Sequence, residues 1–172
     1  MNLIFDLETD GLYNDVTQVH CIGVYDLDAK ESYVFNDQGN QHPISKGVQL
    51  LEDADGLIGH NIIGYDLIVL RKLFPWFNPS CPVVDTLLLS RCYHTDLLKI
   101  DHKRGWKNMP LQLYGRHSLE AYGYRLGEYK GGFGKTSDWK EWSQEMEDYC
   151  QQDVQVTKKL WSHFQKYLNG SN

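Results

Sequence analysis

The chain has 172 residues, a formal net charge of −6 and 41% hydrophobic residues. This length suits one domain with a substantial core, and the composition argues against bulk disorder. No apolar run approaches the roughly 18 residues that a membrane-spanning helix needs, and the opening segment MNLIFDLE has neither the basic region nor the cleavage site of a signal peptide. We therefore expect a single domain over residues 1–172 that acts in the cytoplasm and not in a membrane.

The first part of the chain predicts mainly strands. Residues 2–6 alternate apolar and polar side chains, as a strand does. Residues 16–27 and 31–35 are rich in β-branched and aromatic side chains and are separated by a short turn, so they predict a hairpin. Residues 44–51 have a helical pattern, and the short apolar run 56–60 predicts a buried strand.

The second part predicts mainly helices. The sequence predicts a helix over residues 66–73 and a last short strand at residues 83–84. Asp85, Ser118 and Ser143 can cap three further helices, because their side-chain oxygens accept hydrogen bonds from free backbone N–H groups. The first of these helices is expected to run to residue 91 and the second to residue 125.

The final helix has the clearest pattern. Its apolar residues recur at alternating steps of four and three, which predicts a stripe facing the core: Cys150, Val154, Thr157, Trp161, Phe164 and Leu168. Residues 95–114 have no clear period and are expected to form a long loop. Three strands in a meander, then alternating helices and strands, then a long helix predict an α/β fold with a mixed central sheet covered by helices.

The charge is unevenly distributed along the chain. Between residues 91 and 135, nine Lys and Arg residues stand against four Asp and Glu residues, which gives 9 − 4 = +5 there and −6 − 5 = −11 elsewhere. An acidic body with a basic segment fits a protein that holds cations in one place and a phosphate backbone in another. A solvated, charge-rich loop would explain the same distribution.

Cysteine and histidine give no sign of a zinc site. The four cysteines form no CxxC pair and predict reduced, buried thiols rather than a disulfide framework: they are Cys21, Cys81, Cys92 and Cys150. The seven histidines have no HxxxH or HExxH spacing, which argues against a zinc hydrolase.

Two acidic residues end the first predicted strand. Asp6 and Glu8 are two residues apart, so their side chains lie on the same face of the sheet. Carboxylates placed together repel each other and lose hydration unless a cation joins them, and Mg²⁺ and Mn²⁺ prefer carboxylate oxygens. The pair indicates a metal site, unless the strand lies at an edge with both acids in water.

Three further residues are weak signals when taken alone. Asp66 follows a predicted strand and opens a predicted helix, a place where Asp is usually only a cap or turn residue. Tyr149 and Asp153 are four residues apart on the last helix and therefore share one face. A boundary tyrosine and a solvated aspartate in the acidic run EMEDYCQQD would give the same pattern.

Taken together and in order, these residues are a far more specific motif than any one of them alone. The segments Asp6-Leu7-Glu8-Thr9, Asn61-xxx-Tyr65-Asp66 and Tyr149-xxx-Asp153 resemble, in order, the three motifs of the DEDDy family of 3′→5′ exonucleases. The similarity extends to residues 84–91, 117–127 and 153–158 and looks closest to the proofreading domain of family A DNA polymerases of short-tailed phages. The histidine branch of this family carries His five residues before its last Asp, where this chain has Asp148, so the chain resembles the tyrosine branch.

The resemblance implies a ribonuclease-H-like fold and a metal-dependent reaction. Two ions, Mg²⁺ or Mn²⁺, would clamp the attacking and leaving oxygens of an in-line displacement at phosphorus and release nucleoside 5′-monophosphates. Their implied ligands are Asp6, Glu8, Asp66 and Asp153. Ionising an ordinary tyrosine at pH 7 costs on the order of 4 kcal/mol, whereas a metal-bound water can reach a pKa near ~7 unaided. Tyr149 is therefore expected to position the water rather than to remove its proton.

The same resemblance implies contacts to the substrate. Thr9 and Leu12 match positions that touch the terminal nucleotide, and Asn61 and Tyr65 match positions near its phosphate or sugar; turn formation and core packing are the alternatives. We further expect four cations to steer the strand, with Trp106 as a stacking surface or as a packed loop residue: Lys99, Lys103, Arg104 and Lys107.

The expected substrate is the 3′ end of single-stranded DNA, in the cytoplasm of a bacterium or of a phage-infected host. A DNA polymerase module, covalent or separate, is a possible partner, and no such module is present in these 172 residues. Two alternatives stay open: an exoribonuclease of the same family, and a module that binds single strands without cleaving them.

Overall fold

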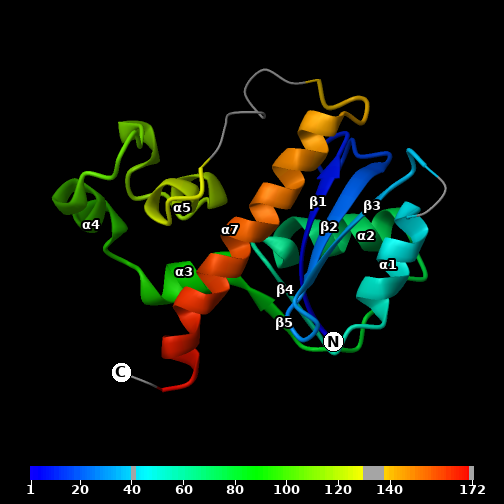
Figure 1. The fold of residues 1–172 in the computed structure, drawn as a ribbon, viewed down its shortest axis with the longest axis horizontal. Coiled ribbons are helices and arrows are strands. Elements are labelled where there is room, and N and C mark those ends of the chain that lie inside the picture. Colours follow the sequence, from blue (N-terminus) through cyan, green and yellow to red (C-terminus); the bar gives the residue numbers. More distant parts are fainter. Residues whose placement is uncertain (40–41, 130–137, 171–172) are drawn as a thin grey trace.

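The structure is a computed structural model that describes residues 1–39, 42–129 and 138–170. Its centre is a five-stranded sheet with the strand order β3-β2-β1-β4-β5 (Figure 1). The strands are β1 (Asn2–Thr9), β2 (Val19–Asp26), β3 (Glu31–Asn36), β4 (Gly56–Gly59) and β5 (Val83–Asp85). β1 to β3 form an antiparallel meander, whereas β4 and β5 run parallel to β1. The predicted mixed sheet is confirmed.

Strand β1 lies in the middle of the sheet, between β2 and β4. Its odd-numbered residues Leu3, Phe5 and Leu7 belong to the main hydrophobic core, while Ile4 points to the other face. Alternation therefore places the even-numbered acids of β1 on the face opposite the main core. The strand is not at an edge, so the interpretation of Asp6 and Glu8 as water-exposed edge residues is wrong.

Helices cover both faces of the sheet. On the main-core face lie α1 (Ile44–Glu52), a π-helical turn η1 (Ile62–Asp66) and α2 (Leu67–Leu73). On the other face, the long helix α7 (Gln144–Leu168) packs across β1, β2 and β4. All eight residues of β2 are buried because both of its faces are covered.

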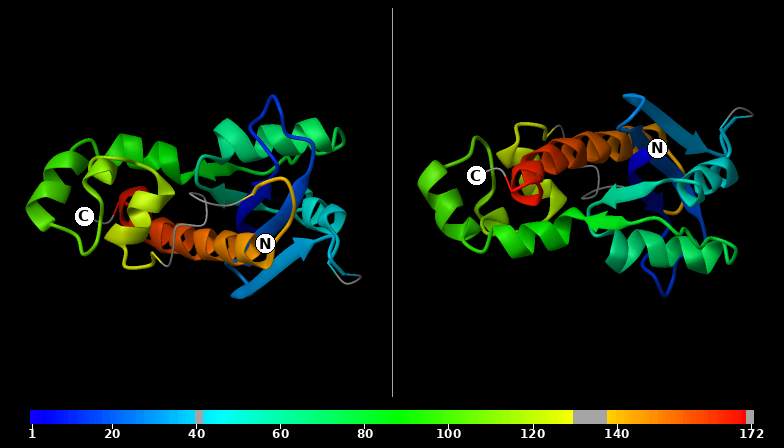
Figure 2. Two further views of the ribbon diagram at one scale, coloured as in Figure 1. Left: turned by 90° about the horizontal axis from the view of Figure 1, so that it is seen from above. Right: turned by 90° about the horizontal axis from the view of Figure 1, so that it is seen from below.

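Three short helices form a lobe beside the sheet. They are α3 (Thr86–Tyr93), α4 (Leu97–Arg104) and α5 (Leu119–Arg125), with a 3₁₀ turn η2 (Leu111–Leu113) between the last two. Figure 2 shows this lobe at one end of the molecule and the sheet at the other, with α7 running between them. No helix in the described ranges is both long and apolar enough to cross a bilayer.

The prediction of a loop over residues 95–114 is wrong, because α4 and η2 lie there. Asp101 on α4 is fully buried and accepts hydrogen bonds from Trp106 Nε1 at 2.7 Å and from Arg125 Nε and Nη2 at 2.9 and 2.7 Å. This buried ion pair joins α4 to α5 across 24 residues. Helix α4 is stabilised by this distant partner rather than by an apolar stripe of its own. Its sequence therefore lacks the apolar period from which a helix can be predicted.

The structure contains the three helix caps that the sequence predicts. The carboxylate of Asp85 accepts from Leu87 N at 2.9 Å, and the hydroxyls of Ser118 and Ser143 each accept from a backbone N–H three residues later at 3.2 Å. All three predicted caps are confirmed.

The prediction of four buried thiols is only partly right. All four cysteines are free, and Cys21 and Cys150 are buried. Cys81 is only partly buried and Cys92 is exposed on α3.

Candidate active site

Strand β1 carries the first two acids of the candidate site. Glu8 is 7% exposed, and Oδ2 of Asp6 is buried without a hydrogen-bond partner among the residues that the structure describes. Asp6 is paired with Gly23 and Glu8 with Cys21 on β2. Carboxylate oxygens that are removed from water in this way need a cation or a hydrogen bond to offset the lost hydration.

Asp66 is brought to β1 by the turn that precedes α2. Its side chain is 4% exposed, and its Oδ2 accepts a hydrogen bond from Leu7 N at 3.3 Å. Leu7 lies between Asp6 and Glu8, so the third acid meets the backbone of the strand between the first two. The predicted helix over residues 66–73 begins one residue later than expected, because Asp66 closes the π-helical turn η1.

Helix α7 brings Tyr149 and Asp153, which are one helical turn apart, against the same strands. The thiol of Cys150, between them in sequence, donates to the main-chain oxygen of Asp6 at 3.5 Å. This contact joins α7 to the main chain of β1. Both Tyr149 and Asp153 interact electrostatically with Asp6.

The pKa shifts of the four acids indicate that they influence one another. Burial raises the pKa of Asp6 to about 7. Burial, followed by the charge of Asp6, raises the pKa of Glu8, of Asp66 and of Asp153. Because Asp6 acts on all three, the acids from β1, η1 and α7 share one electrostatic environment, which a divalent cation would relieve.

Among the described residues, Asp6, Glu8 and Cys150 form a cluster of possible metal ligands. One ligand atom from each lies within 4.8 Å of the others. Asp66 and Asp153 lie outside this cluster, and both interact electrostatically with Asp6. The structure thus brings all four predicted acids to the same region, with two of them in close contact and two around them.

Tyr149 also borders a cavity of about 710 Å³ between α7 and the strands β2 and β3. Its lining includes Gly23, Tyr33 and Asp148 but none of the four acids. The candidate site is therefore the buried junction of β1, η1 and α7 rather than this cavity. Burial, followed by the charge of Asp153, raises the pKa of Tyr149 above its ordinary value.

Thr9 and Tyr65 are joined at the end of β1. Their hydroxyl oxygens are 2.5 Å apart, and each also lies within hydrogen-bond distance of the main-chain oxygen of Gly11, at 3.0 and 2.5 Å. Two hydroxyl protons serve these three contacts and hold the loop that carries Leu12. The side chain of Leu12 is 76% exposed and projects from that loop.

Asn61 has a left-handed backbone with φ 62° and an exposed side chain. Its backbone N donates to Asp85 Oδ1 at 2.8 Å, and Ile63 N donates to Asp85 Oδ2 at 3.0 Å. Asp85 was predicted only as a helix cap, and its role in holding the Asn61 turn beside α3 was missed. No sequence pattern marks that role, because the partners are more than 20 residues apart.

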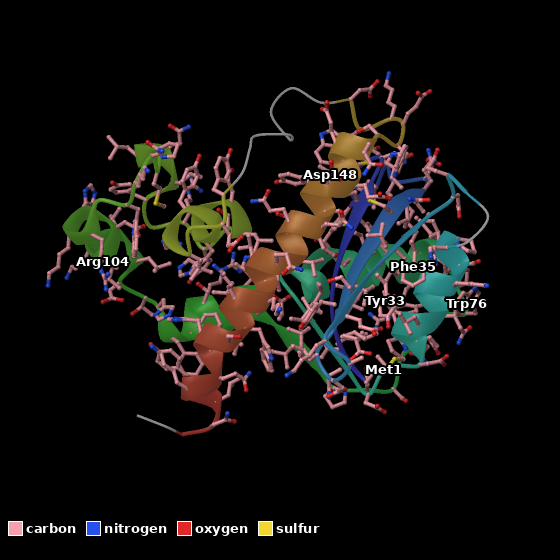
Figure 3. The ribbon with its side chains drawn as sticks, in the orientation of Figure 1. Met1, Tyr33, Phe35, Trp76, Arg104 and Asp148 are labelled. Atoms are coloured by element: carbon pink, nitrogen blue, oxygen red, sulfur yellow. The ribbon has the colours of Figure 1, made fainter. Side chains whose placement is uncertain are left out.

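The predicted basic surface lies away from the acids. Lys99, Lys103 and Arg104 belong to α4, at the outer end of the helical lobe, and Figure 3 shows Arg104 far from Asp148 on α7. Trp106 donates to buried Asp101 and lies under Arg104, with 5.3 Å from the guanidinium to the ring centroid. Trp106 is thus a packed residue of the lobe, and the role of the four cations stays a prediction.

Comparisons with known proteins agree with this architecture. The family model described as the RNase H superfamily matches residues 3–165. A DNA-directed DNA polymerase of Escherichia phage T7 is 34% identical over 187 aligned positions, which cover 92% of this chain and 26% of the polymerase. The chain thus spans about a quarter of the length of the curated relatives that it matches.

Two solved structures show the same fold. Brucella melitensis NrnC with bound Mg²⁺ has a TM-score of 0.66 at 22% identity, covering 98% of this chain and 74% of NrnC. A zinc-bound complex of Escherichia coli ExoI with single-stranded DNA has a TM-score of 0.59 at 16% identity, covering 98% of this chain and 41% of ExoI. The predicted fold and the predicted relationship to phage polymerases are confirmed, and the chain belongs to the RNase H superfamily.

Proposed function

We propose that the chain is a divalent-metal-dependent exonuclease that hydrolyses single-stranded or frayed DNA from the 3′ end, as a proofreading domain does. The observation that carries this proposal is the convergence of acids from three elements around Asp6, whose buried Oδ2 has no hydrogen-bond partner in the described residues. A protein that only bound single strands would gain nothing from burying repelling carboxylates, since they lower the stability of the fold and repel phosphate.

The residues present fit divalent cations. The oxygens of Asp6, Glu8, Asp66 and Asp153 form an all-carboxylate donor set of the kind that Mg²⁺ and Mn²⁺ prefer. Two such ions, when bound, would supply an activated water and stabilise the leaving 3′ oxygen. A structural relative supports a metal, since Brucella melitensis NrnC binds Mg²⁺.

Tyr149 orients the attacking water. Its raised pKa keeps the hydroxyl protonated at neutral pH, so it can donate or accept one hydrogen bond but cannot act as an anionic base. Asp66 holds its carboxylate in place through Leu7 N. The products would be nucleoside 5′-monophosphates.

The terminal nucleotide would lie against the loop at residues 10–18. Thr9 and Tyr65 hold this loop, and Leu12 offers an exposed apolar side chain to a base. Asn61, exposed on its left-handed turn, is suited to a phosphate or sugar contact. The phage polymerase match and the single-stranded DNA in the ExoI complex favour DNA as the substrate and a polymerase module as the partner.

The test is cleavage of a 5′-labelled single-stranded DNA oligonucleotide with Mg²⁺, Mn²⁺ or EDTA. We expect a ladder that shortens by one nucleotide at a time with either metal and no cleavage with EDTA. A matched RNA oligonucleotide separates the exoribonuclease alternative, since it would be the better substrate in that case.

Two variants on the same helix give a matched control. Asp153→Asn should abolish cleavage, whereas Asp148→Asn, an exposed carboxylate on the preceding turns of α7, should leave it intact. Metal-independent cleavage, or equal effects of both variants, would contradict the proposed function.

A further inference from the structure

Two histidines face each other where α3 packs against α7 (Figure 1). His94 is the residue at which α3 ends, and His163 lies on α7. Their Nε2 atoms are 2.6 Å apart and their ring centroids 4.9 Å apart. The two residues are 69 positions apart in the chain, so the short spacings typical of metal motifs do not reveal the pair. It lies outside the candidate active site, and the proposed function gives it no role.

Aromatic side chains of α7 hold both imidazole rings. The ring of buried Phe164 lies 5.5 Å from that of His94 and 5.1 Å from that of His163, measured between centroids. Tyr167 lies 5.6 and 5.8 Å from the same two rings. The backbone N–H of His94 also donates to the main-chain oxygen of Ser90 at 2.9 Å. Packing therefore orients both rings in advance, which lowers the entropy lost when they bind a ligand.

The two facing nitrogens share one proton. A neutral imidazole has one N–H and one lone pair, so the contact is a hydrogen bond from one Nε2 to the other. Burial lowers the pKa of both His94 and His163; Lys166 adds to this effect at both residues, while Asp96 opposes it at His94. Both rings are therefore neutral at pH 7, the form in which imidazole binds metal ions.

The separation of the two nitrogens is close to that of a shared metal ion. Imidazole nitrogen suits Zn²⁺, Ni²⁺ and Cu²⁺, whereas Mg²⁺ and Mn²⁺ prefer oxygen. Zinc lies about 2.0–2.1 Å from each nitrogen, so a tetrahedral angle places two nitrogens about 3.3 Å apart. The Nε2 atoms need to separate by about 0.7 Å to reach this distance. Both side chains are partly exposed, so small rotations of the rings allow this change and leave room for water.

We propose that His94 and His163 form a binding site for Zn²⁺ that joins the end of α3 to α7. The ion forms one bond to each Nε2, and water molecules complete its coordination. The proton shared between the two Nε2 atoms moves through water to Nδ1 of its own ring, so both rings stay neutral and nothing is oxidised. Because only the folded chain holds the two rings together, the ion stabilises the attachment of the helical lobe to α7. This site shares no residue with the four acids and is independent of the proposed function.

The test is a Zn²⁺ titration followed by the imidazole nitrogen resonances of the ¹⁵N-labelled protein. Saturating Mg²⁺ is present throughout to occupy carboxylate oxygens, and Cys92→Ser removes the exposed thiol two residues before His94. We expect the Nε2 resonances of His94 and His163 to shift together, to saturate at one ion per pair, and to show the Nδ1–H tautomer in both rings. The resonances of His102, exposed on α4, should not move.

Single substitutions then test whether the two rings act as one site. His94→Gln and His163→Gln should each weaken Zn²⁺ binding at the remaining ring by more than the roughly 10-fold that follows loss of an outer-shell partner, whereas His102→Gln should not. Zn²⁺ should raise the urea midpoint of the parent protein and not that of either single variant.

The titration of the parent protein decides the inference without any substitution in the pair. Unchanged resonances of both histidines at millimolar Zn²⁺ would show a hydrogen-bonded pair only and overturn it. Equal Zn²⁺ affinity at one ring after replacement of the other would overturn it too, because the two imidazoles would then bind independently.

Discussion

The backbone nitrogen of Leu7 donates a hydrogen bond to Oδ2 of Asp66 at 3.3 Å, which joins the centre of β1 to a turn 59 residues later in the chain. The acid of that turn is thereby held against a strand whose neighbouring residues, Asp6 and Glu8, are acids themselves. The repulsion among these acids raises the free energy of the folded protein without metal. Binding of a cation removes this repulsion and stabilises the fold.

Asp66→Asn should separate these two effects. The amide oxygen can still accept from Leu7 N, while the negative charge beside Asp6 is lost. We expect cleavage to fall on the order of 10²–10³-fold and the metal-free protein to gain about 1 kcal/mol of unfolding free energy. Urea denaturation without metal, together with single-turnover cleavage, measures both. A variant with normal turnover would exclude Asp66 from the site.

Tyr149→Phe should slow cleavage without loss of metal binding. The phenol hydroxyl positions the water, and its loss is expected to cost on the order of 10- to 100-fold in rate, with Mn²⁺ affinity unchanged. Since the raised pKa keeps Tyr149 protonated, the pH dependence of the rate should have the same form in the variant as in the parent protein. A pH profile that loses an ionisation in the variant would instead identify Tyr149 as a base.

The metal-free protein should become less stable as the pH rises from about 4 to 7. Burial raises the pKa of Asp6 from 3.8 to about 7, so the folded chain binds a proton in this range that the unfolded chain has released, and stability falls with rising pH. The loss is on the order of 2–4 kcal/mol, and saturating Mn²⁺ should remove most of it.

Denaturation across this pH range in Asp6→Asn is the control for that prediction, because other groups titrate in the same interval. The difference between the parent and the variant reports the titration of Asp6 together with its effect on the acids whose pKa its charge raises. An identical pH dependence in both proteins would show that the pKa of Asp6 is not raised.

Leu12→Ala should weaken binding of the DNA end without affecting the fold. Leu12 is 76% exposed, so its truncation removes little core packing. We expect KM for a single-stranded oligonucleotide to rise by about fivefold to tenfold, the value of one lost apolar contact. Leu111→Ala, the same truncation at a residue 72% exposed on η2, is the matched control and should leave KM unchanged. Equal KM values in the two variants would rule out contact between Leu12 and the substrate.

The parts of the structure that the sequence predicted are those determined by local rules. Alternation along β1 placed Asp6 and Glu8 on one face, and the caps at Ser118 and Ser143 depend on backbone groups three residues away. The helical stripe through Cys150 and Val154 likewise follows from a period within one element.

The parts that the sequence did not predict depend on distant partners. Helix α4 is tied to the lobe by the pair of Asp101 and Arg125, and no local pattern signals that pairing. The contact of Cys150 with Asp6 joins residues 144 positions apart. Because no local pattern reveals such a contact, the sequence predicted Cys150 only as a core residue of its helix. Only the packing of α7 on β1 shows that its thiol contacts the main chain of Asp6.

The most direct measurement is the titration of the metal-free protein with Mn²⁺ by calorimetry. Two ions are expected per chain, with binding weakened in Asp6→Asn, Glu8→Gln, Asp66→Asn and Asp153→Asn and unchanged in Asp148→Asn. Mn²⁺ binding that none of the first four substitutions affects, or no binding at millimolar Mn²⁺, would contradict the account.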